Sequence, residues 1–117
     1  MEEQIGHFRL AVGGGRVTAA GELDANTCGV LASAIEAAPE RHVVVDLCDV
    51  DFIDSSGLRC LTDQQRRRRE DGGSLRVVPS RAVTRVVELA GLADVLHLVD
   101  ESGTVTGRGG SGDDGIG

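Results

Sequence analysis

The stretch that decides the fold is His42-Val-Val-Val-Asp-Leu-Cys-Asp-Val-Asp-Phe-Ile-Asp-Ser-Ser-Gly-Leu58. It begins with consecutive valines, which lack strict alternation and so predict a strand buried on both faces of a mixed or parallel sheet. A segment with four carboxylates follows, and then two adjacent hydroxyls and a glycine. We expect a turn through the carboxylates and a helix to Glu70 with Ser56 as its N-cap. The stretch therefore predicts a buried strand that delivers Ser55 and Ser56 to the surface at the start of a helix.

The residues on either side of this stretch alternate between strand and helix patterns. Alternating apolar residues flank Gly13-Gly-Gly15, which indicates an N-terminal hairpin because glycine adopts positive φ at little steric cost. Asp24 or Asn26 would cap a first helix that stops at Pro39, and Ser80 would cap a third helix. The predicted strands are 7–12, 16–20, 41–47, 74–79 and 95–99. This order predicts an α/β fold with right-handed crossovers.

Chain length and cysteine content favour one compact domain. A chain of 117 residues can bury roughly two-thirds of the surface that it exposes when unfolded, so its core needs no support from disulfides or metals. The three cysteines are an odd number without a C-x-x-C spacing, so neither a disulfide framework nor a zinc site is expected. Glycine, serine, threonine and aspartate dominate the end of the chain. This composition predicts a domain over 1–101 and a Gly-rich, disordered tail over 102–117.

The formal charge of −7 and the absence of lysine exclude several classes of function. Nucleic-acid affinity depends mainly on cations that neutralise phosphates, so no nucleic-acid partner is expected. Without lysine, P-loop, Schiff-base and Ser-Lys chemistry are excluded. Met1-Glu-Glu-Gln4 lacks the features of a signal peptide, and no apolar run approaches the ~20 residues that span a membrane. We therefore expect a cytoplasmic protein without a membrane partner.

The carboxylates of the predicted turn suggest metal binding or phosphate acceptance. An EF-hand is excluded because its required glycine and terminal glutamate are missing. A response-regulator receiver would need a lysine late in the chain, and this chain has none. We interpret the segment as a solvated acidic turn at the sheet edge, with no metal and no cofactor. Its carboxylates are Asp46, Asp49, Asp51 and Asp54.

The adjacent serines are the second candidate for chemistry. Asp54-Ser-Ser-Gly57 is not the G-x-S-x-G nucleophile elbow, and none of the three histidines has a local partner that suggests a triad. We therefore assign no catalytic residue. A hydroxyl just before a helix N-terminus is instead accessible to a kinase, and phosphorylation adds roughly −1.5 to −2 charges at neutral pH. Ser55 is the expected acceptor, whereas simple capping is the favoured role of Ser56.

Four motifs resemble the STAS domain of bacterial anti-sigma factor antagonists. The resemblance implies a STAS-like fold, in which a mixed sheet with an N-terminal hairpin carries its helices mainly on one face. It also implies that Ser55, the serine directly after the aspartate, is phosphorylated by a partner kinase that is itself the anti-sigma factor. The motifs, which cover about Phe8 to Val99 in order and spacing, are Gly21-Glu-Leu-Asp24, Val43-Val-Val-Asp-Leu47, Phe52-Ile-Asp-Ser-Ser-Gly-Leu58 and Leu89-Ala-Gly-Leu92.

The same resemblance implies a non-enzymatic partner switch that regulates transcription in a stress or sporulation response. Its partners would be a GHKL-type ATP-binding serine kinase, whose capture releases a sigma factor, and a PP2C-type phosphatase. The protein itself would be a monomer or a weak dimer. The alternative is a STAS scaffold or sensor that binds a nucleotide or another partner without serine phosphorylation. The implied partner-binding residues are Asp24, Asp54, Ser56, Gly57, Leu58 and Arg59.

Two features depart from the family pattern. Family members usually end in a further amphipathic helix, whereas Gly-rich sequence follows Glu101 here. The expected second helix also carries Arg59 and the run Arg66–Arg69. Steps of about 100° per residue spread these arginines around the helix. We interpret the run as a solvated helix end that complements the helix dipole.

Overall fold

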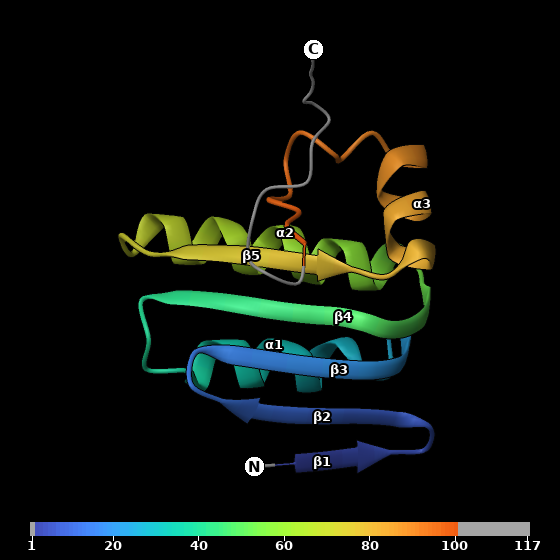
Figure 1. Ribbon diagram of the computed structural model, residues 1–117, viewed down its shortest axis with the longest axis horizontal. Coiled ribbons are helices and arrows are strands. Elements are labelled where there is room, and N and C mark those ends of the chain that lie inside the picture. The colour runs from blue at the N-terminus through green and yellow to red at the C-terminus, as the bar shows by residue number, and fades with distance from the viewer. Residues whose placement is uncertain (1, 101–117) are drawn as a thin grey trace.

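A five-stranded mixed sheet forms the centre of the protein, whose computed structural model describes residues 2–100. The strands are β1 (Glu2–Ile5), β2 (Phe8–Gly13), β3 (Arg16–Leu23), β4 (His42–Ile53) and β5 (Ser74–Pro79). They lie side by side in chain order (Figure 1). The first three pair antiparallel, whereas β3, β4 and β5 run parallel to one another.

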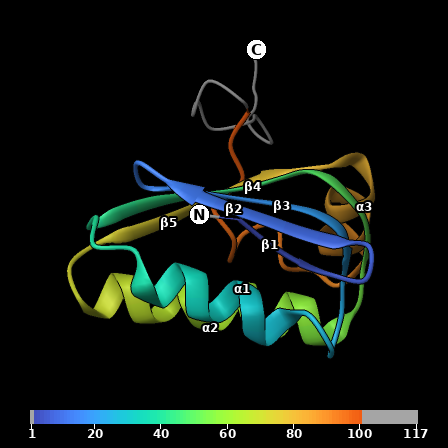
Figure 2. The same ribbon diagram turned by 90° about the horizontal axis from the view of Figure 1, so that it is seen from below.

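Two crossover helices cover one face of this sheet. Helix α1 (Cys28–Ala37) connects β3 to β4, and helix α2 (Ser55–Glu70) connects β4 to β5. Figure 2 shows both helices on the same side of the sheet, starting from the same edge. Helix α3 (Arg81–Leu89) stands beyond the ends of β4 and β5 (Figure 1). The predicted α/β fold, with an N-terminal hairpin and helices mainly on one face, is confirmed.

The hydrophobic core lies between the sheet and helices α1 and α2. Alternate residues of the strands point toward the helices, because successive side chains of a strand face opposite sides. Each large apolar side chain buried in this way stabilises the fold by about 1.5–3 kcal/mol. The largest fully buried side chains in this layer include Val17, Leu23, Leu31, Ile35, Val43, Val45, Leu47 and Leu61.

Strand β4 extends well beyond its expected end. The acidic segment was expected to be a turn after Leu47, but the strand continues to Ile53. One extra residue of β4 lies between the Thr18–Asp46 and Ala20–Asp49 pairs, as in a β-bulge. A second shift precedes the Glu22–Phe52 pair. These irregularities keep Val50 and Ile53 buried. Asp49 and Asp51 belong to the strand and not to a turn, whereas Asp46 lies in the strand as predicted.

Three other expectations need correction. Strand β1, which pairs along the outside of β2, was not expected from its polar sequence. The predicted strand over 95–99 is reduced to isolated bridging, in which Leu98 pairs with Val77. It is held partly by α2, because the His97 backbone N–H donates to Oε1 of the buried Gln65 at 3.0 Å. Neither Asp24 nor Asn26 caps α1, whose N-cap is Thr27.

The remaining boundaries agree with expectation or fall outside the described residues. Ser80 caps α3 as predicted, since its hydroxyl accepts from the Val83 N–H at 3.1 Å. The same hydroxyl donates to the Val50 carbonyl at 2.6 Å and so fixes α3 to the end of β4. The predicted tail over 102–117 lies outside the described part of the chain. Within residues 2–100, no helix combines the length and apolar character needed to cross a membrane.

Candidate functional site

The Asp54 carboxylate starts α2 and presents Ser55 as the first helical residue. Asp54 is the N-cap, and its Oδ1 accepts from the Gly57 N–H at 3.1 Å. This capping role was expected of Ser56, so the two serines are not a capping pair. Ser55 is exposed, while Ser56 is half-buried. The cap therefore leaves both hydroxyls available for other interactions at a helix N-terminus.

Gly57 lets the first turn of α2 sit directly on the ends of β3 and β4. A Cβ at this position would lie 2.7 Å from Ile53 Cγ1 and 2.8 Å from the Leu23 carbonyl oxygen. Gly57 and Leu58 are both buried within the protein. Their expected part in partner binding stays a prediction, and burial makes that part indirect, through the position of Ser55.

Asp24 lies at the neighbouring strand end. The Asp54 N–H donates to the Leu23 carbonyl at 3.2 Å, so the residues that follow β3 and β4 are adjacent. The Asp24 carboxylate accepts from the Asn26 N–H at 3.0 Å. The buried Thr27 hydroxyl accepts from the Asp24 N–H and donates to the Glu22 carbonyl. Thr27 therefore holds the Asp24 turn in place. The only signal of this role in the sequence is a polar side chain just before a predicted helix.

A pocket of about 490 Å³ lies beside the start of α2. It brings together three of the predicted residues, Ser55, Ser56 and Arg59. Asp24, by contrast, does not line it. The other lining residues were not predicted from the sequence, although helical spacing places them on the same side of α2 or at the start of α1. They are Cys28, Cys60 and Asp63.

The acidic residues of β4 divide into two kinds. Asp49 and Asp51 are exposed. Asp46 pairs with Arg16 across the sheet at 2.6 Å. Partial burial acts to raise the pKa of Asp46, but the Cys48 N–H and the Arg16 guanidinium outweigh it and hold the pKa below its ordinary value. Among residues 2–100, no group of three or more potential ligands is placed to hold a metal ion.

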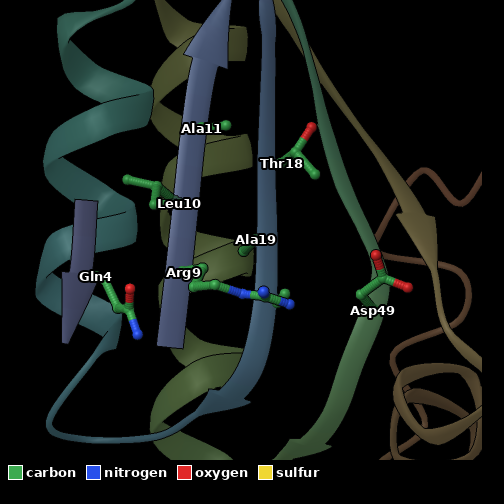
Figure 3. Close-up of a pocket in the computed structure, with 8 residues that line it drawn as sticks. Gln4, Arg9, Leu10, Ala11, Thr18, Ala19 and Asp49 are labelled. Carbon is green, nitrogen blue, oxygen red and sulfur yellow. The ribbon is translucent and has the colours of Figure 1, made fainter. Parts of the chain in front are cut away.

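The helix-free face of the sheet carries a separate open hollow of about 480 Å³. Its walls come from β1 to β4 and include Gln4, Arg9, Thr18 and Asp49. In Figure 3, Arg9 reaches from β2 across β3 toward Asp49, with the helices behind the strands. The hollow and the Ser55 pocket therefore lie on opposite sides of the sheet.

The arginine run of α2 is only partly a solvated helix end. Arg66 and Arg67 are exposed and pair with Asp63, and Arg67 also reaches Glu36 at 3.2 Å. Arg68 instead crosses to α1. Its guanidinium donates to backbone carbonyls at and just beyond the end of α1, those of Ile35, Ala38 and Glu40. Arg68 therefore fixes the two helices to each other. This role could not be predicted from the sequence, because Arg68 lies within a run of arginines.

Comparison with known proteins shows the class to which the chain belongs. A protein-family model described as "Mlab, STAS domain" matches residues 7–100. Because this match covers most of the chain, the chain belongs to the STAS domain family. Ser55 and its capping aspartate lie where its fourth strand passes into its second helix.

Named relatives make the comparison more specific. The anti-sigma F factor antagonist of Paenibacillus polymyxa is 28% identical over 89 residues, which cover 72% of this chain and 76% of the relative. A putative anti-sigma factor antagonist from Thermotoga maritima has a structure with a TM-score of 0.65 and 20% identity, covering 81% of this chain and 87% of that one. The phosphorylated form of the Bacillus cell fate determinant SpoIIAA gives a TM-score of 0.59 and 21% identity, covering 81% and 93%. At these identities the two structures show a shared fold.

Proposed function

We propose that the chain is a non-enzymatic anti-sigma factor antagonist, a binding protein controlled by phosphorylation of Ser55. The observation that carries the proposal is the placement of Ser55, an exposed hydroxyl at the first residue of α2 and at the wall of a pocket. The capping aspartate occupies the Gly57 N–H, so the serine is not needed to start the helix. A kinase can therefore modify Ser55 without dismantling the fold.

The unphosphorylated surface binds a GHKL-type serine kinase that acts as an anti-sigma factor. Asp24, Asp54, Ser56 and Arg59 are assigned to its contacts. The last three flank Ser55 at the start of α2, and Asp24 follows the adjacent end of β3. Capture of that kinase releases a sigma factor, and the exchange takes place in the cytoplasm. The names of the similar proteins, which are anti-sigma factor antagonists, support this assignment.

Phosphate on Ser55 dissociates the complex with the kinase by electrostatic repulsion. A phosphoserine adds roughly −1.5 to −2 charges at neutral pH. The N-terminal N–H groups of α2 tolerate that charge within the monomer. At an interface that already contains Asp24 and Asp54, the added charge repels acidic groups of the partner and must be desolvated. A PP2C-type phosphatase then restores the binding form.

The test is phosphorylation by candidate GHKL-type kinases in the presence of ATP, followed by intact mass and peptide mapping. We expect one phosphate, located on Ser55. Ser55→Ala is expected to accept none and to bind the kinase constitutively. Ser55→Asp is expected to bind at least about tenfold more weakly, equivalent to about 1.4 kcal/mol.

Ser56→Ala is the matched control, because it removes the neighbouring hydroxyl and leaves the Asp54 cap intact. It should still be phosphorylated on Ser55. Phosphate on Ser56, or equal affinity of the kinase for wild type and Ser55→Asp, would refute the proposal.

The alternative is a scaffold or sensor that binds a nucleotide or another ligand without phosphorylation. The open hollow around Arg9 is the observation that favours it, because it offers a cation beside a ligand-sized space. Calorimetric titration with ATP and GTP, compared between wild type and Arg9→Ala, tests this alternative. Binding that Arg9→Ala weakens, with no phosphate on Ser55, would support the scaffold.

A further inference from the structure

The Cys60 thiol meets the backbone of Cys28 at the seam between α1 and α2, beside the proposed phosphorylation site. Cys28 is the first residue of α1, and Cys60 lies in the second turn of α2. The Cys60 thiol donates to the Cys28 carbonyl oxygen at 3.4 Å. Both side chains are half-buried and line the same pocket as Ser55. The pair is therefore close, partly accessible and next to the switch.

The two helices hold these thiols in register. Gln64 Nε2 donates to Glu36 Oε2 at 2.9 Å, one turn beyond Cys60 along the seam. Arg67 reaches the same carboxylate at 3.2 Å, and Arg68 ties the far end of the seam to α1. The helices start at the same edge of the sheet (Figure 2). The approach of Cys60 to Cys28 thus belongs to a fixed helix pair and not to a mobile loop.

We propose that Cys28 and Cys60 form a reversible disulfide that staples α1 to α2 and closes the pocket beside Ser55 to the partner. Peroxide is the oxidant class. The disulfide itself is independent of the function proposed above, whereas its effect on partner binding rests on that function.

The chemistry balances with peroxide as the sole oxidant. The Cys28 sulfur attacks the O–O bond, which gives Cys28 sulfenic acid and one water. The Cys60 sulfur then attacks the sulfenic sulfur, and its proton leaves with the sulfenic hydroxyl as a second water. The two thiols are oxidised to one disulfide as hydrogen peroxide is reduced to two waters. A dithiol reductant reverses the bond by thiol–disulfide exchange.

The environments of the two thiols indicate which of them reacts with peroxide first. The Cys28 thiol faces the exposed Ala25 carbonyl at 3.7 Å, so a dissolved oxidant reaches it first. Burial raises the pKa of the Cys60 thiol to about 12, with further contributions from electrostatic interactions with Cys28, Asp63 and Glu36. Cys60 is therefore a poor first nucleophile at neutral pH, because the thiolate is the reactive form. It acts as the resolving thiol, and disulfide formation should accelerate as pH rises.

Disulfide formation changes the docking surface directly. It removes the Cys60 hydrogen bond to the Cys28 carbonyl and places two bonded sulfur atoms within the pocket that Ser55 lines. It also fixes the start of α1 against the start of α2. A partner that fits the reduced pocket no longer fits the oxidised one, so oxidation and phosphorylation act on the same surface.

The test is treatment of the full chain with hydrogen peroxide, followed by intact mass and disulfide mapping. We expect a monomer that has lost two hydrogens, a Cys28–Cys60 linked peptide, and full recovery with dithiothreitol. Cys28→Ser and Cys60→Ser should each abolish this product. Cys48→Ser is the matched control, since Cys48 lies on β4 and does not line the pocket, and it should leave the product unchanged.

Two results would overturn the disulfide. One is oxidation of Cys28 to the sulfinic acid while Cys60 stays a thiol, and the other is linkage only between separate molecules. Its effect on binding is measured with a kinase that phosphorylates the reduced protein, and we expect the oxidised form to react at least about tenfold more slowly. An unchanged rate would overturn the closure of the pocket. Absence of any such kinase would count against the function proposed above, and the mapping would still decide the disulfide.

Discussion

At the scale of single residues, the start of α2 depends on the absence of a side chain at Gly57 and on the carboxylate of Asp54. The absent side chain of Gly57 allows the helix to touch Leu23 and Ile53. The carboxylate of Asp54 supplies the cap. Ser55 takes its exposed position because these two neighbours meet the requirements of packing and capping.

Gly57→Ala is expected to destabilise the protein. The new Cβ would lie 2.7 Å from Ile53 Cγ1 and 2.8 Å from the Leu23 carbonyl, so α2 must shift. Overpacking of this kind costs about 1–3 kcal/mol. Urea unfolding measures the loss. Gly29→Ala is the control, because nothing lies within 4 Å of its Cβ, and it should raise stability by about 0.5–1 kcal/mol. Equal stability of Gly57→Ala and wild type would contradict the packing argument.

Asp46 should make stability depend on pH in the acid range. Its pKa is lowered in the folded protein, so its contribution is fully present above the ordinary value of about 3.9 and is lost as pH falls through the depressed pKa. Urea unfolding at a series of acidic pH values measures this loss. Asp46→Asn should reduce the loss of stability at acidic pH. Arg16→Gln should reduce this loss in part, because the substitution removes the ion-pair partner of Asp46. Parallel curves for wild type and Asp46→Asn would contradict the prediction.

At the scale of elements, α1 and α2 act as one unit. Their seam is polar along much of its length, with Gln64 and Arg67 on Glu36. Arg68 closes the seam at the end remote from Ser55 by donating to the carbonyls of Ile35 and Ala38, where α1 ends. A helix pair fixed at both ends presents a defined surface to a partner.

Arg68→Ala is expected to lower the free energy of unfolding by about 1.5–3 kcal/mol. The substitution removes hydrogen bonds from a charged donor and leaves partly buried backbone carbonyls without that donor. Arg68→Lys should restore only part, because an ammonium lacks the planar fork of donors. Thermal or urea unfolding measures both. Exposed Arg69 provides the control, and Arg69→Ala should change stability by no more than about 0.5 kcal/mol. Similar losses for both alanine variants would refute the special role of Arg68.

The elements also show how far the sequence alone could lead. The hairpin, the parallel strands and the three helices followed from apolar periodicity and from Gly, Pro and Ser signals. The length of β4 did not, because bulges break the alternation that marks a strand and carboxylates suggest a turn. The Cys28–Cys60 approach could not be predicted either, because it depends on how two helices separated by a strand pack together. Ser55 was found from a motif, while its aspartate cap required the structure.

At the scale of the whole molecule, the features around Ser55 lie at one edge of the sheet. The starts of α1 and α2 and the carboxyl ends of β3 and β4 meet there, with α3 close by (Figures 1 and 2). Phe52, near the end of β4, is 47% exposed and stands between exposed Asp51 and the start of α2. Aromatic side chains, phenylalanine included, are enriched at protein–protein interfaces, so we expect Phe52 to take part in docking.

Phe52→Ala is expected to weaken binding of the kinase by about 5–30-fold while the protein stays folded. The exposed part of the ring is expected to contact the partner. Calorimetry or surface plasmon resonance measures the affinity. Leu89→Ala is the matched control, because Leu89 is 81% exposed at the end of α3 that points away from the sheet (Figure 1). Equal losses in both variants would indicate a general surface effect and not a docking role.

The parallel crossovers have a consequence for the opposite edge. Each helix must run back along the sheet before the next strand can start, so the far edge receives only short connections, at 14–15, 38–41 and 71–73. With a longest dimension of 43 Å, the molecule keeps these connections far from Ser55. The far edge is therefore a place where a fluorophore or an added domain can be attached while the recognition edge stays open. The same layout lets evolution exchange partners by changing one edge and leave the folding of the other unaffected.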